Sequence, residues 1–294
     1  MELECWAVLS AAISAIAVRM QGKSRDRYST AWILRVYLWA VLHERPVVWA
    51  CERRNWPRRV CPEDLPDQST MSRRMRRGDF EPALAVLQQR LAGVPVGRSL
   101  LKLRVIDGKP LELPNHTSDR DATWGRGVSR TSVGYKLHAV WSGRSLPDAF
   151  VVTPLGVCEK QMAARLIGRV GDAGYLLGDS HYNASWLFDT CRQHGHRLLC
   201  PRTKPGTGRG HRPQSRWRLR TIDQMEPPPS GSRFGPSLYR TRSSIERRFA
   251  RLTSTAGGLS TLPSWVRRIR RVRLWVWAKL LINATTPMRA RRRA

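Results

Sequence analysis

The stretch Leu101-Lys-Leu-Arg-Val-Ile-Asp107-Gly108 decides the fold, because it is the first strand-like run of the chain and ends on an aspartate. Further strand patterns occupy residues 134–141, 149–153, 175–179 and 197–201. Helical patterns occupy residues 159–170 and 184–194 between the later strands. This order of strands and helices predicts an α/β fold with a sheet of mixed direction flanked by helices.

Residues 1–100 show no convincing strand and predict an all-α region, with helices near residues 5–20, 30–43 and 81–91. Between the last two, Ser69 is the predicted N-cap of a further helix that buries Met71 and Met75. The same helix would point a set of basic side chains outward, namely Arg73, Arg74, Arg76 and Arg77. The pattern fits the second helix of a helix-turn-helix DNA-binding unit, and a solvated basic helix is the open alternative.

The charge of the chain predicts a polyanionic partner. The 294 residues include 52 Lys and Arg against 22 Asp and Glu, a formal net charge of +30. Nucleic acid is the expected partner rather than an acidic membrane, because no lipid-anchoring pattern is present. From residue 201 to the end there are 23 Lys and Arg and only three acids: Asp223, Glu226 and Glu246. An isolated Glu246 in such a field of positive charge indicates a specific role.

Three acids stand in distinctive settings. Asp107 and Asp179 each follow an apolar strand-like run, and Glu246 lies in an arginine-rich helical pattern at residues 238–252. A crossover helix between the two strands would make them parallel and bring both aspartates to the same edge of the sheet. Carboxylates that hold divalent ions within a basic chain are what a two-metal nucleic-acid enzyme needs. Taken singly, each acid also has a structural explanation: a turn, a helix N-cap, or an ion pair of Glu246 with Arg242.

Four stretches in order give the chain a resemblance to a known family. They are Val105-Ile-Asp-Gly-Lys-Pro-Leu111, Gly134-Tyr-Lys-Leu-His-Ala139, Leu177-Gly-Asp-Ser-His-Tyr-Asn183 and Tyr239-x2-Arg242-x3-Glu246. Together they resemble the DDE transposases of bacterial insertion sequences, over roughly residues 100–285. The resemblance implies an RNase H-like catalytic domain. The family signature often continues with a Lys seven positions after the Glu, and this chain has Thr253 there.

The resemblance also implies the chemistry of the site. Asp107, Asp179 and Glu246 are the expected catalytic residues and would hold two Mg²⁺ (or Mn²⁺) ions, about 3.5–4 Å apart as in other two-metal sites. The activity implied is metal-dependent cleavage of element ends and their joining to target DNA. The partners implied are double-stranded DNA and a second copy of the chain, as a homodimer in the synaptic complex.

Further side chains are candidates for binding DNA. Tyr239 and Arg242 share one helical face with Glu246 by their spacing and would touch the adjacent phosphate. Lys109 and Lys136 flank the predicted site, with a solvated surface role as the equal alternative. Trp217 would stack on an unpaired base, although a loop Trp more often packs on its own domain.

The expected organisation has three parts. These are a helical DNA-binding region (1–100), a DDE catalytic domain (101–260) with a loop-like basic insertion (203–236), and a C-terminal helix with a basic tail (261–294). Six cysteines without a CxxC pair, and no apolar run long enough to span a bilayer, predict a cytoplasmic protein with no membrane partner. The resemblance implies a location at the bacterial nucleoid. The alternatives are a catalytically decayed, transposase-derived DNA-binding protein and an RNase H-like nuclease without strand transfer. A basic RNA-binding protein is a more distant alternative.

Overall fold

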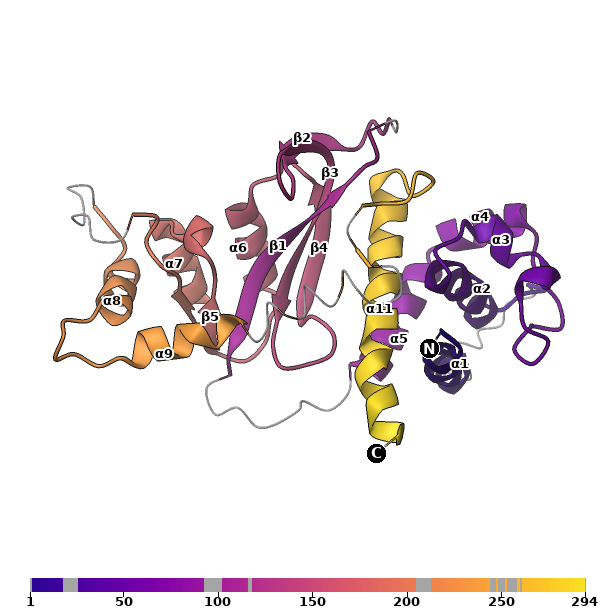
Figure 1. Ribbon diagram of the computed structural model, residues 1–294, viewed down its shortest axis with the longest axis horizontal. Coiled ribbons are helices and arrows are strands. Elements are labelled where there is room, and N and C mark those ends of the chain that lie inside the picture. The colour runs from indigo at the N-terminus through magenta and orange to yellow at the C-terminus, as the bar shows by residue number, and fades with distance from the viewer. Residues whose placement is uncertain are drawn as a thin grey trace. The chain divides into compact units, whose positions relative to one another are not determined.

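The computed structural model describes residues 2–17, 26–92, 102–115, 118–204, 213–243, 247, 252, 258–259 and 261–293, with the backbone alone at 286–293. Glu246 and Thr253 therefore lie outside the described residues. The chain divides into two compact units (Figure 1). The helical unit comprises Met1–Gly93, Pro114–Thr117 and Arg251–Ala294, and the sheet unit comprises Val94–Leu113 and Ser118–Ala250.

The helical unit is built from both ends of the chain. Its elements are α1 (Glu2–Ala17), α2 (Thr30–Leu42), α3 (Val47–Ala50), the 3-10 helix η2 (Arg53–Asn55), α4 (Gln68–Arg76), α5 (Phe80–Leu91) and α11 (Ile269–Arg293). The C-terminal helix α11 packs against α1, α2 and α5. A cluster of tryptophans fills the core near α2, where the Trp39 and Trp56 rings stack at 4.6 Å and Trp6 meets both edge-on. The C-terminal segment is thus an integral part of the N-terminal helical fold.

Helix α4 begins at a different residue from the one predicted. Its N-cap is Asp67, whose Oδ1 accepts a hydrogen bond from the Thr70 backbone N–H at 2.6 Å. The predicted cap, Ser69, is wrong by two residues; its hydroxyl donates to Asp67 Oδ1 instead. A carboxylate accepts the free amides of a first helical turn more strongly than a hydroxyl does, because it also carries the charge favoured there. Met71 is buried, as predicted.

The sheet unit contains the predicted mixed sheet. Its strands are β1 (Arg104–Glu112), β2 (Thr123–Arg126), β3 (Thr131–Trp141), β4 (Ala149–Pro154), β5 (Gly174–Leu177) and β6 (His196–Leu199). The order is β2-β3-β1-β5-β6, with β4 also paired to β3. Strands β1, β3 and β4 are antiparallel neighbours, whereas β5 and β6 run parallel to β1. The predicted fold class, a mixed α/β sheet flanked by helices with an all-α N-terminal region, is confirmed.

Two helices cover one face of the sheet. Helices α6 (Glu159–Ile167) and α7 (Ser185–Gln193) bury a shared cluster with β1, β3, β5 and β6. That cluster includes Ile106, Val140, Leu166, Leu187, Phe188 and Leu198. Each of these side chains comes from the apolar stripe of its element, so burial of this face orders the strands. The strands that carry the site are therefore held in place by this buried apolar cluster.

The predicted loop at residues 203–236 is wrong in part, because it contains helix α8 (Arg216–Met225). Ser215 caps this helix by accepting hydrogen bonds from the Trp217 and Arg218 backbone N–H groups. Thr221 is buried and donates to the Leu198 carbonyl at 2.9 Å, which ties α8 to β6. The helix was not predicted because the segment is rich in arginine and proline and the apolar stripe of the helix is short. Helix α9 (Phe234–Arg240) follows and packs against α8.

Within the part of the chain that the structure describes, no helix has both the length and the apolar character needed to cross a membrane.

Candidate active site

The register of two parallel strands brings Asp107 and Asp179 together. Strand β1 pairs with β5 through Arg104 with Leu176 and Val105 with Leu177. Each aspartate stands two residues beyond the Val105–Leu177 pair, so both reach the same edge of the sheet. The negative charge of Asp179 also contributes to raising the pKa of Asp107, as expected of neighbouring carboxylates. The two aspartates therefore lie at one site.

Asp107 lies inside β1, whereas the sequence pattern placed it at the end of the strand. The strand continues to Glu112 because its other edge stays paired with β3, and Asp107 stands opposite Ala139. On the β5 side, the described pairing stops at Val105. Asp107 is thus held firmly by β3 at the point where β5 leaves the sheet, which leaves room for its carboxylate.

Negative charge dominates the surroundings of Asp107. The pKa of Asp107 is raised to about 6; burial is the largest cause, and the Asp179 and Glu159 charges act in the same direction. The Gly108 N–H, 2.9 Å from Oδ1, and Arg242 act in the opposite direction. Arg242 lies with its Nη2 3.8 Å from Asp107 Oδ2. Two neighbouring aspartates, one of them with a raised pKa, form an electrostatic environment that a divalent cation would stabilise.

Asp179 is fixed by the short 3-10 helix η3 (Ser180–Tyr182) that follows it. Its Oδ1 accepts a hydrogen bond from the His181 backbone N–H at 2.9 Å, and its Oδ2 lies 3.3 Å from His181 Nδ1. The structural alternative for Asp179, a helix N-cap, is thus realised. The cap also orients the carboxylate, so it is compatible with a role at the site.

Tyr182 packs beneath the Asp179 loop. A side chain at Gly178 would come within 2.9 Å of the Tyr182 ring, so a glycine is needed for this close approach. The Tyr182 hydroxyl is buried and has no hydrogen-bond partner among the described residues. Burial raises its pKa well above the usual value, and the charges of Glu159, Asp107 and Asp179 add to that rise. The hydroxyl therefore belongs to the immediate surroundings of the acids.

Glu159 is a site residue that the sequence analysis missed. It begins α6, and its Oε1 accepts a hydrogen bond from Lys136 Nζ at 2.6 Å. A Cβ at position 108 would lie 3.3 Å from Glu159 and Lys136, so Gly108 admits this pair beside Asp107. No motif marks Glu159, because an acid in the first turn of a helix is ordinary. Lys136 is buried in this ion pair, which directs its charge to Glu159 rather than outward.

Tyr239 lies beside Asp179, and Arg242 lies beside Asp107. The Tyr239 hydroxyl donates to the Gly178 carbonyl at 3.1 Å, next to Asp179. Arg242 faces Asp107, and its guanidinium carbon lies 6.0 Å from the centre of the Tyr239 ring. Burial lowers the pKa of Lys109, which the Asp107 charge partly offsets. These contacts place three of the predicted DNA-binding side chains around the acids.

The third predicted acid, Glu246, lies outside the described residues. Among the residues that the structure does describe, no three His, Cys, Asp or Glu side chains are grouped closely enough to hold a metal ion. Asp107 and Asp179 are the described carboxylates with the position and charge to contribute to such a site. Glu159 is engaged by Lys136 and is a less available ligand.

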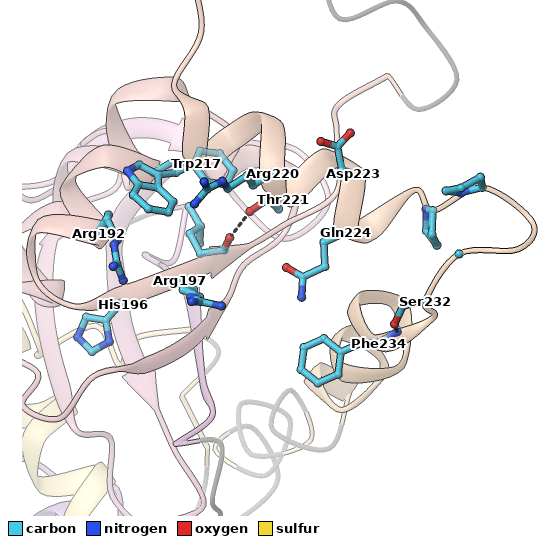
Figure 2. A pocket seen from close by; sticks show the side chains of 15 residues that line it. Arg192, His196, Arg197, Trp217, Arg220, Thr221, Asp223, Gln224, Ser232 and Phe234 are labelled. Carbon is cyan, nitrogen blue, oxygen red and sulfur yellow. Dashed lines mark hydrogen bonds between the residues drawn. The ribbon is translucent and has the colours of Figure 1, made fainter.

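Trp217 lies in a pocket of about 610 Å³ formed by α7, β6, α8 and the segment before α9 (Figure 2). The guanidinium carbons of Arg192, Arg216 and Arg220 lie 4.7, 4.7 and 4.8 Å from the centre of its ring. The ring is half-buried and packs against the sheet core. Trp217 therefore serves as a platform for arginines of the chain itself, through cation–π contacts.

The predicted outward basic face of α4 is wrong at Arg74. This side chain is 8% exposed and forms ion pairs with Asp26 at 3.0 Å and Asp79 at 3.5 Å. Arg77 also pairs with Asp26, at 2.6 Å. Arg73 is exposed and donates to Thr70 Oγ1. A buried guanidinium needs such paired carboxylates, so Arg74 stabilises the helical unit and does not reach its surface.

Comparison with known proteins shows the family of the chain. Residues 98–283, more than half of the chain, match the family described as "Transposase DDE domain". The chain belongs to this transposase family. The matched range includes Asp107, Asp179 and Glu246.

Two further comparisons of this transposase-family chain concern curated proteins and solved structures. No curated protein matches it. Among solved structures it is similar to a chain of the "Cryo-EM structure of piggyBac transposase synaptic complex with hairpin DNA", with a TM-score of 0.48 and 10% sequence identity. That similarity covers 96% of this chain and 73% of the other.

Proposed function

We propose that this transposase-family chain is an active DNA transposase that cuts and joins the ends of an insertion sequence by phosphoryl transfer. The observation that carries the proposal is the β1–β5 register, which sets Asp107 and Asp179 side by side with Arg242 against Asp107. Neighbouring, half-buried carboxylates beside a cation that fits a phosphate are suited to metal-dependent chemistry on DNA. A DNA-binding protein without catalysis has no need of them.

Asp107, Asp179 and Glu246 are the proposed ligands of two divalent ions, Mg²⁺ or Mn²⁺. The charge balance at Asp107 fits this role, since burial and two neighbouring acids raise its pKa more than the Gly108 N–H and Arg242 lower it. Oxygen ligands of this kind are those that Mg²⁺ prefers. When bound, such ions supply Lewis-acid activation of the attacking oxygen and stabilisation of the leaving oxygen.

The remaining side chains hold and orient the phosphodiester. Arg242 and Tyr239 lie between the two aspartates, so a phosphate that approaches the acids also meets their donors. The His181 N–H fixes the Asp179 carboxylate, and Gly108 lets the Lys136–Glu159 pair support β1 from the neighbouring elements. Lys109, with a pKa lowered by burial, is placed to neutralise part of the charge that the phosphate brings.

The proposed reaction proceeds in two steps at the same acids. In the first, water attacks a phosphodiester at the element end, a new phosphorus–oxygen bond forms, and the 3′ oxygen leaves as a hydroxyl. In the second, that 3′-hydroxyl attacks a phosphodiester of target DNA, and the displaced 3′ oxygen leaves. No side-chain nucleophile is required, and none of the described acids has to form a covalent bond to DNA.

The proposed setting follows from the reaction. The substrate is double-stranded DNA, at element ends and target, and a homodimer would hold two ends in one complex. The proposed location is the nucleoid in the bacterial cytoplasm. Arg192, Arg197 and Arg220 line the pocket around Trp217 and offer additional positive charge to the DNA backbone.

The test is strand cleavage and joining on duplexes that carry an independently verified element end, with Mg²⁺ or Mn²⁺. Wild type is compared with Asp179→Asn and Glu246→Gln. Asp223→Asn is the matched control, because Asp223 is an exposed acid of the same unit outside the acid cluster. Metal-dependent nicks followed by joined products in wild type and control, and neither in the two variants, is the expected result.

Other outcomes separate the alternatives. Binding of DNA by folded wild type without any cleavage would support a catalytically decayed, DNA-binding descendant. Cleavage without joined products would support a nuclease that shares the fold. Equal activity in wild type and Asp179→Asn would overturn the assignment of the acids.

A further inference from the structure

A groove of about 780 Å³ in the helical unit is lined by segments from both ends of the chain. One wall comes from α4, from the chain after α2 with Arg45, and from Val48 in α3. The other comes from Trp265 to Trp275, at and before the start of α11. All of these residues lie within one compact unit, so the groove is a feature of that unit alone.

The charged side chains among the described lining of this basic groove are all positive. The lining includes six arginines (Arg45, Arg76, Arg267, Arg268, Arg270 and Arg271) and neither an aspartate nor a glutamate. Arg270 has a structural task, since it donates to the Met75 carbonyl at 2.9 Å and pairs with Glu81. It thereby ties α11 to α4 and α5 and fixes the two walls. Concentrated, one-signed charge on a fixed scaffold is the electrostatic signature of a polyanion site.

Four of the arginines are exposed. One of them, Arg267, donates to the Ser264 carbonyl at 2.8 Å, and the other three offer their guanidinium groups to a ligand. They are Arg45, Arg76 and Arg271. Each comes from a different part of the fold: the chain after α2, helix α4 and helix α11. Arg76 is oriented by a hydrogen bond to Ser72 Oγ at 2.8 Å, one turn earlier on the same wall. A guanidinium held in this way still presents several N–H donors outward.

The groove defines which face of α4 is open to a partner. Gln68, Ser72, Met75 and Arg76 line it, and their spacing of four, three and one residues places them on one side of the helix. Met71, beside this face, and Arg74, on the far side, are buried in the unit. The functional face of this basic helix is therefore the one that meets the C-terminal segment.

Two exposed apolar side chains, Val48 and Trp265, lie in the same groove, with exposed fractions of 40% and 39%. Large apolar groups beside arginines suit deoxyribose and base edges next to phosphates. A second copy of the chain fits poorly, because it carries the same net charge of +30. The phosphate spacing of a duplex instead supplies a row of negative charges for arginines from three segments.

We infer that the basic groove binds the phosphate backbone of duplex DNA, and that both ends of the chain build this surface together. The inference rests on the proposed function for the choice of DNA as the polyanion. It adds a binding site that needs neither metal nor the acids of the sheet unit. Because the contacts are to phosphates, binding there is independent of base sequence and weakens steeply with salt.

The experiment measures binding of a fluorescein-labelled duplex of arbitrary sequence by anisotropy, in EDTA, over a range of salt concentrations. The groove variant Arg45→Ala/Arg76→Ala/Arg271→Ala is compared with the matched control Arg54→Ala/Arg58→Ala/Arg59→Ala. The control removes three exposed arginines of the same unit that do not line the groove. Circular dichroism and melting temperature establish that both variants are folded, as expected for exposed side chains.

The expected result is a Kd about tenfold or more above that of wild type for the groove variant, and a slope of log Kd against log salt that is smaller by about two to three. The control changes Kd by a few-fold at most, and Arg45→Lys/Arg76→Lys/Arg271→Lys keeps most of the affinity. Equal losses in groove variant and control, or no loss in either, would overturn the inference while leaving the proposed function standing. Failure of wild type to bind duplex DNA at all would overturn both.

Discussion

The acid cluster of the sheet unit and the basic groove of the helical unit are both proposed to act on DNA, but through side chains of opposite charge. The acids are few, buried and placed by strand register, with Asp107 and Asp179 matched through the Val105–Leu177 pair. The arginines of the groove are numerous, exposed and drawn from three separate segments. Catalysis depends on a fixed geometry in a site of low dielectric constant, whereas backbone binding depends on summed surface charge. The two regions should therefore respond differently to the same kind of substitution.

The largest expected effect comes from Asp107→Asn. Loss of one carboxylate should lower the rate of strand cleavage by about 10³-fold, because charge stabilisation in the transition state is lost. Duplex affinity in EDTA should stay within a few-fold of wild type, since the groove is unchanged. Cleavage kinetics and anisotropy on the same preparation check this. A parallel loss of affinity would show that the acids and the groove are not separable.

The next effect distinguishes two neighbouring arginines of α4. Arg74→Ala removes a buried cation and leaves Asp26 and Asp79 without it, which should lower the free energy of unfolding by about 3 kcal/mol. Arg73→Ala, exposed on the same helix, should change it by less than about 0.5 kcal/mol. Urea unfolding of both variants measures the difference. Similar values for the two would contradict the inward placement of Arg74.

A third effect uses pH to probe the strand beside the acids. The pKa of His138 is lowered to about 4; burial is the largest cause, Glu159 opposes the shift, and Lys136 acts with burial. Its Nε2 lies 3.0 Å from Thr153 Oγ1 in the core. The unfolded chain then binds more protons than the native one between pH 6.5 and 4. Stability from neutral His138 is thus full above about pH 6.5 and is lost as the pH falls toward 4.

The measurement is the unfolding free energy in urea at pH 7 and pH 5, without metal, for wild type and His138→Gln. The group accounts for about 2 kcal/mol of the loss at pH 5, so the variant should lose about that much less than wild type. Asp107, with its raised pKa, acts with the opposite sign, and comparison of the two proteins cancels it. Identical pH dependence in both would show that His138 is not buried in its neutral form.

The smallest effect concerns Tyr182→Phe. The substitution removes a buried hydroxyl that has no hydrogen-bond partner among the described residues, so stability should be unchanged or higher by up to about 1 kcal/mol. Thermal melting of metal-free protein checks this. A clear destabilisation would mean that the hydroxyl has a partner that the packing does not reveal. The result would refine the picture of how tightly the acids are surrounded.

Strand periodicity and the motifs around Asp107 and Asp179 were sufficient to predict the mixed sheet and the meeting of these two acids. The reason is local: apolar runs of period two define strands, and a crossover helix makes β1 and β5 parallel. The true length of β1 was not predictable in the same way. It depends on pairing with β3 as far as Glu112 and Gly134, which is a long-range contact.

Burial of charged side chains was the least predictable part. Arg74 and Lys136 read as exposed cations in the sequence, yet each is buried against acids that lie far away along the chain. Glu159 joined the site for the same reason, through Lys136 and Gly108. The basic groove was also not predictable from the sequence, because its two walls are far apart along the chain. They come together through the packing of α11 on α1, α2 and α5. Such effects arise from tertiary contacts and leave no periodic signal.

The central claim is that Asp107 and Asp179 hold a divalent ion, and its most direct test is Mn²⁺ binding by isothermal titration calorimetry without DNA. Wild type should bind Mn²⁺, whereas Asp107→Asn and Asp179→Asn should each weaken binding at least about tenfold, as loss of a charged oxygen ligand does. The control Asp223→Asn should bind as wild type does. Unchanged Mn²⁺ affinity in both aspartate variants would contradict the account.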